Sequence, residues 1–430
     1  MVSDTRRGHG DGERTKVGAW TVFAILAAVF VFSYFIRLST GVLGPTLMED
    51  LRLDVEQLGL LAGAFFYAFA FCQIPVGVAL DSFSPKYVLL ATLMPAIAGC
   101  ALFALAGNFS TALWGRILIG VGMSSMLMGS LKIFGNWFRQ DQFAFLSGMM
   151  LSLGNLGAFV SAAPLVFAVT MIGWRNCFWA FSLFLALSFL AILLFVKDEP
   201  GRGPASSTSA AASGGSSRGI GRLSSLGVVF LDRNFWMISL SAFIRYGSLI
   251  CIQGFLGTLY LVQVMGYPAQ KAGNILSMIA IGYLVGSPLM GRLSDSMFRS
   301  RKKVMVWGLF LYTLFMPLFL LDPDSDLLWY ITFFALGFFA SIGAVSFAHV
   351  KELFPKEVSG VALTANNLFN IGGVAVGQHV IGMLMARYPA TVTGHSVEAY
   401  HAAFTVLFLS SLFGFLLYLF VEDSRIPSST

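Results

Sequence analysis

The chain has 430 residues, of which 57% are hydrophobic and 11% charged, and its mean hydropathy is +0.79. Roughly a quarter of the residues in a soluble protein are charged. This composition therefore excludes an ordinary soluble domain and indicates a protein of the lipid bilayer. The net charge is +6, but the basic residues lie in short segments between apolar runs. That is the usual orientation signal of a membrane protein, and it does not predict nucleic-acid binding.

Twelve apolar segments are long enough to cross a bilayer as helices. They lie near residues 18–44, 57–80, 86–107, 110–132, 143–168, 175–196, 235–262, 270–292, 303–321, 327–350, 357–386 and 400–421. Between the sixth and the seventh, a stretch rich in Gly, Ser, Ala and Pro has little to bury, which predicts a flexible linker. The sequence thus predicts an all-α integral membrane protein with an N-terminal tail (1–17), a six-helix bundle (18–196), a linker (197–234), a second six-helix bundle (235–421) and a C-terminal tail (422–430).

The 27 lysines and arginines are unevenly distributed between the two sides of the predicted bundles. If both tails lie in the cytoplasm, most of these residues are cytoplasmic, and the outer loops hold only Arg52, Arg175, Lys271 and Arg387. Lys and Arg are enriched in cytoplasmic segments, so both tails and the linker are predicted to be cytoplasmic. The lack of long soluble insertions favours a bacterial inner membrane.

The two halves of the sequence repeat one another at three places. The matching pairs are SYFIRLS (33–39) with SAFIRYG (241–247), GVALD (77–81) with GRLSD (291–295), and SGMMLSLGNLG (from Ser147) with SGVALTANNLF (from Ser359). The last pair places Asn155 opposite Asn367. Two repeats of six spans are typical of transporters whose substrate site lies between the halves, near the membrane midplane.

Several short motifs, taken together with twelve spans, are characteristic of one family. They are G-x-x-L-D after the second span (Gly77, Leu80, Asp81), R-x-x-x-G-x-G in the fourth (Arg116, Gly120, Gly122), Gly173-Trp174-Arg175 before the sixth and Glu352-Leu353-Phe354-Pro355 before the eleventh. On these motifs the chain resembles the major facilitator superfamily over nearly its whole length. The first loop departs from the family pattern, because Ser82 stands where a basic residue is common.

The resemblance implies a secondary active or facilitative transporter that works by alternating access, as a monomer, on a small-molecule substrate. It implies a central cavity lined by spans 1, 4, 7 and 10, and loops that close the cytoplasmic side through Gly77, Asp81, Gly291 and Asp295. A co-transported proton is an option that the resemblance leaves open. Within the family, residues 35–51 and 66–81 look similar to bacterial and lysosomal carriers of amino acids or short peptides.

Arg37 and Arg245 are the charged members of the first repeat, and each lies inside an apolar span. Placing a guanidinium in a membrane costs a few kcal/mol, and such a group normally faces a water-filled cavity. A guanidinium binds a carboxylate or phosphate through two parallel hydrogen bonds. No Asp or Glu lies well inside a span, which favours an anionic ligand as the counter-charge. The alternative is that the two arginines only fix helix packing.

Other polar residues inside the spans are further candidates. The candidates for substrate binding are Tyr67, Tyr283, Asn155, Asn366, Asn367, Asn370 and Lys132, with Gln73 and Gln253 as weaker ones, and the candidates for proton handling are Arg116 and His349. Each has a structural alternative: interhelical hydrogen bonding for the uncharged groups and helix packing, snorkelling or solvation for the basic ones.

The leading hypothesis is a transporter of a small organic anion or zwitterion, such as an amino acid or a short peptide. A monocarboxylate or dicarboxylate carrier and a non-transporting membrane sensor of the same fold are the alternatives. The sequence contains no phosphate-binding loop, no His/Cys metal cluster and no nucleophile elbow. It therefore predicts no direct use of ATP, no cofactor, no metal and no enzymatic activity.

Overall fold

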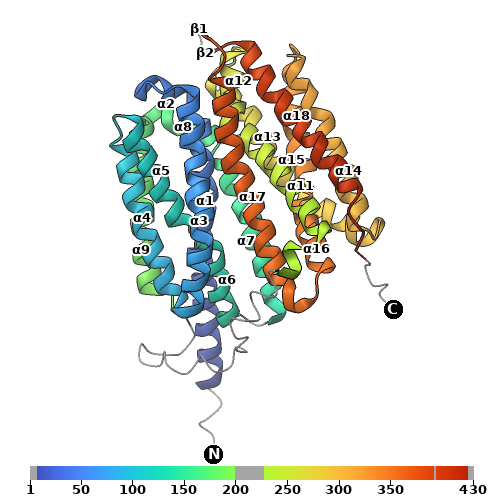
Figure 1. The fold of residues 1–430 in the computed structure, drawn as a ribbon. Helices are drawn as coiled ribbons and strands as arrows, with labels where there is room; N and C mark the ends of the chain where they lie inside the picture. The colour runs from blue at the N-terminus through green and yellow to red at the C-terminus, as the bar shows by residue number, and fades with distance from the viewer. Residues whose placement is uncertain (1–6, 139, 199–226, 392–393, 425–430) are drawn as a thin grey trace, which may run out of the picture.

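The computed structural model describes residues 7–138, 140–198, 227–391 and 394–424. Within these ranges the chain folds into two helical bundles that stand side by side (Figure 1). The start of α1 and the end of α18 lie toward the same end of the molecule, which we call the termini face; the other end is the opposite face (Figure 1). The sequence-based prediction of an all-α membrane fold is confirmed, apart from a hairpin of two-residue strands, β1 (Ala390–Thr391) and β2 (Gly394–His395).

The described helices of the N-terminal half are α1 (Arg7–Val42), α2 (Gly44–Leu51), α3 (Val55–Ser82), α4 (Pro85–Ala104), α5 (Phe109–Met123), α6 (Met126–Trp137), α7 (Gln140–Val160), α8 (Ala163–Ile172) and α9 (Trp174–Phe195). Those of the C-terminal half are α11 (Arg233–Cys251), the π-helical turn η2 (Ile252–Leu256), α12 (Gly257–Gln263), α13 (Ala269–Arg292), the π-helical turn η3 (Leu293–Met297), α14 (Arg301–Phe315), the 3₁₀ turn η4 (Met316–Leu320), α15 (Asp326–Ala340), α16 (Gly343–Leu353), α17 (Lys356–Met385) and α18 (Val397–Leu419).

Eleven helical segments of the described chain are long and apolar enough to cross a membrane. A twelfth span is broken: Ser152–Val160 and Ala163–Ile172 meet at a bend of 42°. Pro164 stands in the first turn of α8, where its missing N–H and its ring prevent a continuous helix with α7. With the broken span included, the count agrees with the twelve spans predicted from the sequence.

The fourth and tenth spans are interrupted at matching places. Ser124 and Ser125 separate α5 from α6, and Ser341 and Ile342 separate α15 from α16. The Ser124 and Ser341 hydroxyls each donate a 2.6 Å hydrogen bond to the carbonyl three residues earlier, Val121 and Phe338 respectively. Such bonds compete with the helical ladder and bend a helix. At the breaks, the Ser124 carbonyl accepts a hydrogen bond from Gln73 and the Ala340 carbonyl one from Arg245, beside the cavity described below.

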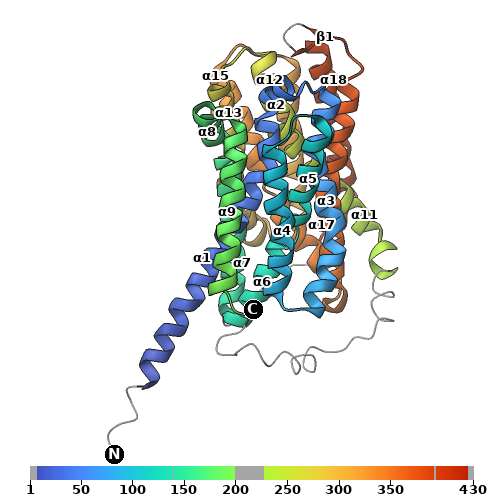
Figure 2. The same ribbon diagram turned by 90° about the vertical axis from the view of Figure 1, so that its left-hand side faces the viewer.

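Two segments outside the predicted bundles are partly helical. The tail predicted for residues 1–17 is helical from Arg7 onward, because α1 continues beyond the apolar segment and extends away from the bundle (Figure 2). A helix satisfies its own backbone hydrogen bonds and can continue into water. Of the predicted linker, residues 199–226 lie outside the described part of the chain, and residues 227–230 form a helical turn before α11.

The two halves contact each other near the opposite face. A Cβ placed on Gly41 of α1 would lie 1.8 Å from the carbonyl oxygen of Gly254 in η2, so only glycine permits this approach. A Cβ on Gly59 of α3 would lie 2.7 Å from the Gln378 carbonyl oxygen in α17. Between α8 and α13, the Ala163 amide donates to a serine hydroxyl. Small residues allow such close helix contacts in membranes.

A candidate substrate-binding cavity

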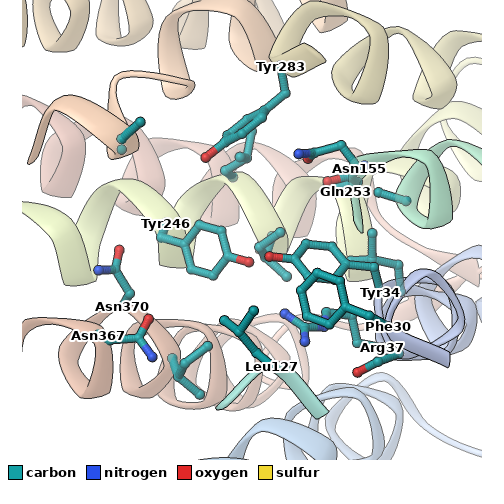
Figure 3. A pocket seen from close by; sticks show the side chains of 18 of the residues that line it. Phe30, Tyr34, Arg37, Leu127, Asn155, Tyr246, Gln253, Tyr283, Asn367 and Asn370 are labelled. Atoms are coloured by element: carbon teal, nitrogen blue, oxygen red, sulfur yellow. The ribbon is translucent and has the colours of Figure 1, made fainter. Parts of the chain in front are cut away.

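A cavity of about 560 Å³ lies between the two halves. Its lining comes from α1, α3, α5, α6 and α7 on one side and from α11, η2, α13, α16 and α17 on the other. In Figure 3, Tyr34 and Asn155 from the N-terminal half point into the same space as Tyr246 and Tyr283 from the C-terminal half. The inter-half contacts at Gly41 and Gly59 lie nearer the opposite face than the cavity residues of α1 and α3, and Ala163 follows Ala158, the last cavity residue of α7, toward that face. The cavity is therefore separated from the opposite face.

Six of the nine predicted substrate-binding residues line this cavity: Arg37, Arg245, Tyr283, Asn155, Asn367 and Asn370. The weaker candidates Gln73 and Gln253 line it as well. Cavities of this size, with an apolar lining and a few converging polar groups, are the usual form of small-molecule sites.

The other three predicted binding residues lie elsewhere. Tyr67 is 39% exposed on the outside of the α3–α17 seam, where its hydroxyl lies 3.4 Å from Nδ1 of His379. Asn366 is fully buried, and its side-chain oxygen accepts a hydrogen bond from the Ser239 hydroxyl. Lys132 donates to the Leu80 carbonyl near the end of α3. None of the three belongs to the cavity lining.

Arg245 is held firmly by its surroundings. Its side chain is 2% exposed, and Nη1 donates a 2.6 Å hydrogen bond to the carbonyl of Ala340, the last residue of α15. Nη2 donates a 3.4 Å hydrogen bond to Oδ1 of Asn370. Nε is buried and has no partner. The guanidinium is thus oriented by two acceptors, Ala340 and Asn370.

Arg37 lies among aromatic rings. Its guanidinium carbon is 4.1 Å from the centroid of the Tyr34 ring and 5.3 Å from that of Phe69. It is 6% exposed, and its Nε is also buried without a partner. Cation–π contacts attract a guanidinium without fixing its direction as a carbonyl acceptor does.

The cavity carries positive charge without a protein counter-charge. Among the described residues that line it, Arg37 and Arg245 are charged and none is Asp or Glu. The remaining polar groups are amides and hydroxyls, which donate and accept hydrogen bonds without charge. The arrangement can bind a small molecule that carries anionic groups and hydroxyls.

Tyr34 and Tyr246 line the cavity and were not among the sequence-based candidates. Tyr34 precedes Arg37 by three residues and therefore shares its face of α1, a signal that the sequence did contain. Tyr246 directly follows Arg245, and no spacing rule predicts that adjacent helical residues both face one cavity. Here the lining is wide enough to include both.

Arg116 is fully buried and lies outside the cavity lining. Its guanidinium donates to three backbone carbonyls: Ile36 at 2.9 Å, Arg37 at 3.3 Å and Leu61 at 3.4 Å. It also lies 5.1 Å from the Phe65 ring centroid. These contacts tie α5 to α1 and α3, which is the packing alternative. A proton-handling role for Arg116 stays a prediction.

His349 is buried at the termini face and also lies outside the lining. Its two ring nitrogens lie 2.7 Å from the Tyr418 hydroxyl and 2.9 Å from the Glu422 carbonyl oxygen. The ring therefore links α16 to the end of α18 and the segment after it. Its predicted role in proton transfer is likewise untested.

The predicted gating residues lie at the termini face. Asp295 forms an ion pair with Arg301, and Arg301 also pairs with Glu352 at 2.7 Å. The side chain of Asp81 lies outside the described part of the structure. A Cβ on Gly77 or Gly291 would meet nothing within 4 Å, so neither glycine is required by close packing in this conformation. The gating roles remain predictions.

Comparison with known proteins agrees with this fold and cavity. The Major Facilitator Superfamily model matches residues 25–274 and 238–430, so the chain belongs to this family of transmembrane transporters. A solved structure of a bacterial homolog to the human lysosomal transporter Spinster, in an inward-facing and unoccupied conformation, has the same fold, with a TM-score of 0.72. The two sequences are 17% identical, and the match covers 96% of this chain and 99% of that chain.

The names of two relatives bear on the class of substrate. The chain is 26% identical to the probable galactarate/D-glucarate transporter of Escherichia coli (strain K12) over 413 residues, covering 84% of this chain and 86% of the relative. It is 24% identical to the probable sulfoacetate transporter of Cupriavidus necator over 281 residues, which is 65% of each chain and thus less than two thirds of that relative. These names support the prediction of an organic anion as substrate. They do not support the narrower prediction of an amino-acid or short-peptide carrier.

Proposed function

We propose that this protein carries a small organic dianion across a bacterial inner membrane by alternating access. The observation that carries the proposal is the pair of guanidiniums, Arg37 and Arg245, which face one cavity from opposite halves with no carboxylate among the described lining residues. Two unneutralised positive charges in a site of low dielectric favour a ligand with two negative charges.

The names of the two relatives support a dianion. Galactarate and D-glucarate each carry two carboxylates, and sulfoacetate carries a carboxylate and a sulfonate. In this chain, Asn155, Asn367, Gln253 and Tyr283 line the cavity between the arginines' helices. Amides and hydroxyls match the hydroxyl groups of a sugar acid, so we favour a polyhydroxylated dicarboxylate.

The distribution of Lys and Arg supports a cytoplasmic termini face. In that orientation, the present conformation is closed toward the outside by the Gly41–Gly254 contact. Transport then requires the halves to separate at the opposite face and to approach each other at the termini face. We propose a monomer, because each chain contains both halves of the cavity.

The experiment is ligand binding by the purified protein in detergent. The panel contains D-glucarate, galactarate and sulfoacetate as dianions, D-gluconate and acetate as monoanions, and alanine and a dipeptide as zwitterions. A ligand that binds the native state raises the unfolding temperature as its concentration exceeds Kd. We expect at least one dianion to stabilise the wild type, and the Arg37→Ala and Arg245→Ala variants to bind it roughly 100-fold more weakly.

The Arg37→Lys and Arg245→Lys variants are the matched controls, since they keep the charge and lose the bidentate geometry. Intermediate affinity in both supports direct binding of an anionic group. Uptake of the stabilising dianion into liposomes then tests transport. Equal stabilisation of wild type and both alanine variants, or stabilisation by zwitterions alone, would contradict the proposal.

A further inference from the structure

Resting on the proposed function, we propose that Asn370 and Gly343 are positioning residues that set Arg245 as the fixed anchor for one anionic group of the substrate. Arg37 is then the adaptable second contact. The two halves of the cavity would thus have different tasks, although their arginines stand in matching sequence repeats. Asn370 and Gly343 would determine the preference for dianions over monoanions.

The first step of the argument is the position of the Arg245 guanidinium at the break in the tenth span. The break leaves the Ala340 carbonyl at the C-terminal end of α15, where carbonyls lack helical partners and carry partial negative charge. Nη1 of Arg245 binds this oxygen at 2.6 Å. The contact neutralises only part of the charge of the arginine, because its acceptor is a dipole.

The second step is the space that Gly343 provides. A Cβ at this position would lie 2.8 Å from Nη2 of Arg245 and 3.2 Å from both Cζ and Nη1. The guanidinium therefore lies flat against the backbone of Gly343, at the start of α16. Any side chain here would force the guanidinium to shift, with Nη2, the atom that binds Asn370, displaced first.

The third step is the neutral acceptor. Asn370 is 4% exposed, and its Nδ2 donates a 3.2 Å hydrogen bond to the Asn366 carbonyl one turn earlier. That bond turns Oδ1 toward Arg245. An aspartate would orient Arg245 equally well but would also supply a full counter-charge. The amide orients the guanidinium and leaves its charge for the ligand.

Arg37 provides the contrast. Its close neighbours are the rings of Tyr34, Phe65 and Phe69, which tolerate small rotations of the guanidinium. Its side-chain hydrogen-bonding neighbour is the hydroxyl of Tyr34 on the same helix, which is not a fixed backbone acceptor. No glycine of the described chain would place a Cβ against its side chain as Gly343 does for Arg245. Arg37 can therefore follow the second anionic group of ligands that differ in length.

The test uses the full-length protein with the variants Gly343→Ala, Asn370→Asp and Asn370→Ala. The control is Gly372→Ala, whose new Cβ would lie 3.8 Å from a Phe243 ring carbon, an ordinary contact. The first readout needs no ligand: the rate at which phenylglyoxal modifies Arg245, measured by peptide mass spectrometry against Arg37 in the same molecule. The second is the Kd of D-glucarate and of D-gluconate.

We expect Gly343→Ala to raise the modification rate of Arg245 at least about threefold while that of Arg37 stays constant, because the displaced guanidinium enters the cavity. Glucarate affinity should fall about tenfold in this variant and stay unchanged in Gly372→Ala. Asn370→Asp should weaken glucarate at least about tenfold more than Asn370→Ala does, and should weaken gluconate less, because a fixed carboxylate cancels one of two binding charges.

Each result bears on the inference. An unchanged Arg245 rate in Gly343→Ala overturns it, whatever the ligand data show. Equal glucarate affinities in Asn370→Asp and Asn370→Ala overturn the role of the neutral amide. If Gly343→Ala does not fold, the two Asn370 variants carry the same test, with faster Arg245 modification expected in Asn370→Ala. A wild type that binds neither probe but shows the expected Arg245 rates contradicts the proposed function and not the positioning.

Discussion

At the termini face, both halves of the molecule have a carboxylate that caps a helix, and the two halves differ at the residue next to the capped serine. In both, a carboxylate that follows the last helix of the half accepts hydrogen bonds at the start of an earlier helix, from a serine hydroxyl and a backbone N–H. The groups are Asp198 with Ser84 and Lys86 in the N-terminal half, and Asp423 with Ser300 and Lys302 in the C-terminal half. In each half, this carboxylate ties the segment after the last helix to the start of an earlier helix of the same bundle.

The C-terminal half also carries an ion-pair network at the termini face, centred on Arg301. Arg301 contacts Asp295 and Glu352, and its side chain is only 12% exposed. At the corresponding place in the N-terminal half, the residue between the serine and the lysine is Pro85. The two halves therefore have the same capping carboxylate, but differ in charge at the residue after the serine, which is Pro85 in one half and Arg301, the centre of the described network, in the other.

The largest effect on stability is expected from removing Arg301, the basic residue of the ion-pair network. Arg301→Ala leaves two carboxylates near each other without their partner, and should lower the free energy of unfolding by about 2 kcal/mol. Pro85→Ala, the matched change in the other half, should alter it by less than about 0.5 kcal/mol. Unfolding in detergent by heat or denaturant measures both. Equal losses in the two variants would erase the proposed difference between the halves.

Because both halves have the capping carboxylate, removing it should lower the free energy of unfolding by similar amounts in the two halves. Asp198→Ala and Asp423→Ala each remove the acceptor at a helix start, which typically costs about 1 kcal/mol. The two losses should agree within about 0.5 kcal/mol and should add in the double variant, because the sites lie in different bundles. A much larger loss in one variant would show that the carboxylates are not equivalent.

A smaller effect is expected from transferring the network. Asn136-Trp137-Phe138 precedes the fifth span as Glu352-Leu353-Phe354 precedes the eleventh, so Glu352 matches Asn136 when the two phenylalanines are aligned. The Nδ2 of Asn136 donates to the Asp198 carbonyl. The double variant Pro85→Arg/Asn136→Glu should show a favourable coupling of about 0.7 kcal/mol in a double-mutant cycle, since the new pair lies at the surface. Zero coupling would indicate that the backbone of the N-terminal loop does not allow the pair to form.

The smallest effect concerns the opposite face, where Asp50 binds Trp174 and Arg175, each at 2.8 Å. The hydrogen bond from the Trp174 indole, followed by that from Arg175, lowers the pKa of Asp50 below its ordinary value of 3.8. The folded state therefore binds this proton less readily than the unfolded chain, and the resulting stability is present above pH 3.8 and lost as pH falls through the lowered pKa.

Because the Asp50–Arg175 pair is about two-fifths exposed, the contribution should be only about 0.4 kcal/mol. The difference in unfolding temperature between wild type and Asp50→Asn should be constant from pH 8 to 5 and should shrink below pH 4. A difference that grows on acidification would contradict the sign.

The sequence predicted the spans, the repeat and the two cavity arginines, because apolar length and rare intramembrane charge are local signals. The sequence was less successful at predicting which polar residues of each span face the cavity. Tyr67 precedes the cavity residue Phe69 by two positions, which places it about 200° around α3 and therefore outside the cavity. Asn366 and Asn370 share a face, yet Asn366 packs against Ser239 and only Asn370 reaches the lining.

Other features depend on contacts between distant residues. Asp198 and Asp423 cap helices more than 100 residues earlier in the chain, and no spacing in the sequence indicates those pairs. The π-helical turn η2 and the break at Ser341 arise from competition between local hydrogen bonds and tertiary packing. These features determine where Arg245 and Gln253 lie, so the geometry of the cavity required the structure.

The approach of Gly41 to Gly254 has a consequence for turnover. Two backbones touch there without side chains, and no hydrogen bond or ion pair is recorded between these two residues. Separating these two glycines breaks no hydrogen bond and no charged contact between them, so only van der Waals attraction holds this pair together. The Ala163–Ser277 hydrogen bond between α8 and α13 is a separate, polar contact between the halves. The strength of the Gly41–Gly254 contact therefore depends on how closely the two backbones fit, and it can re-form after each separation without any bond being made.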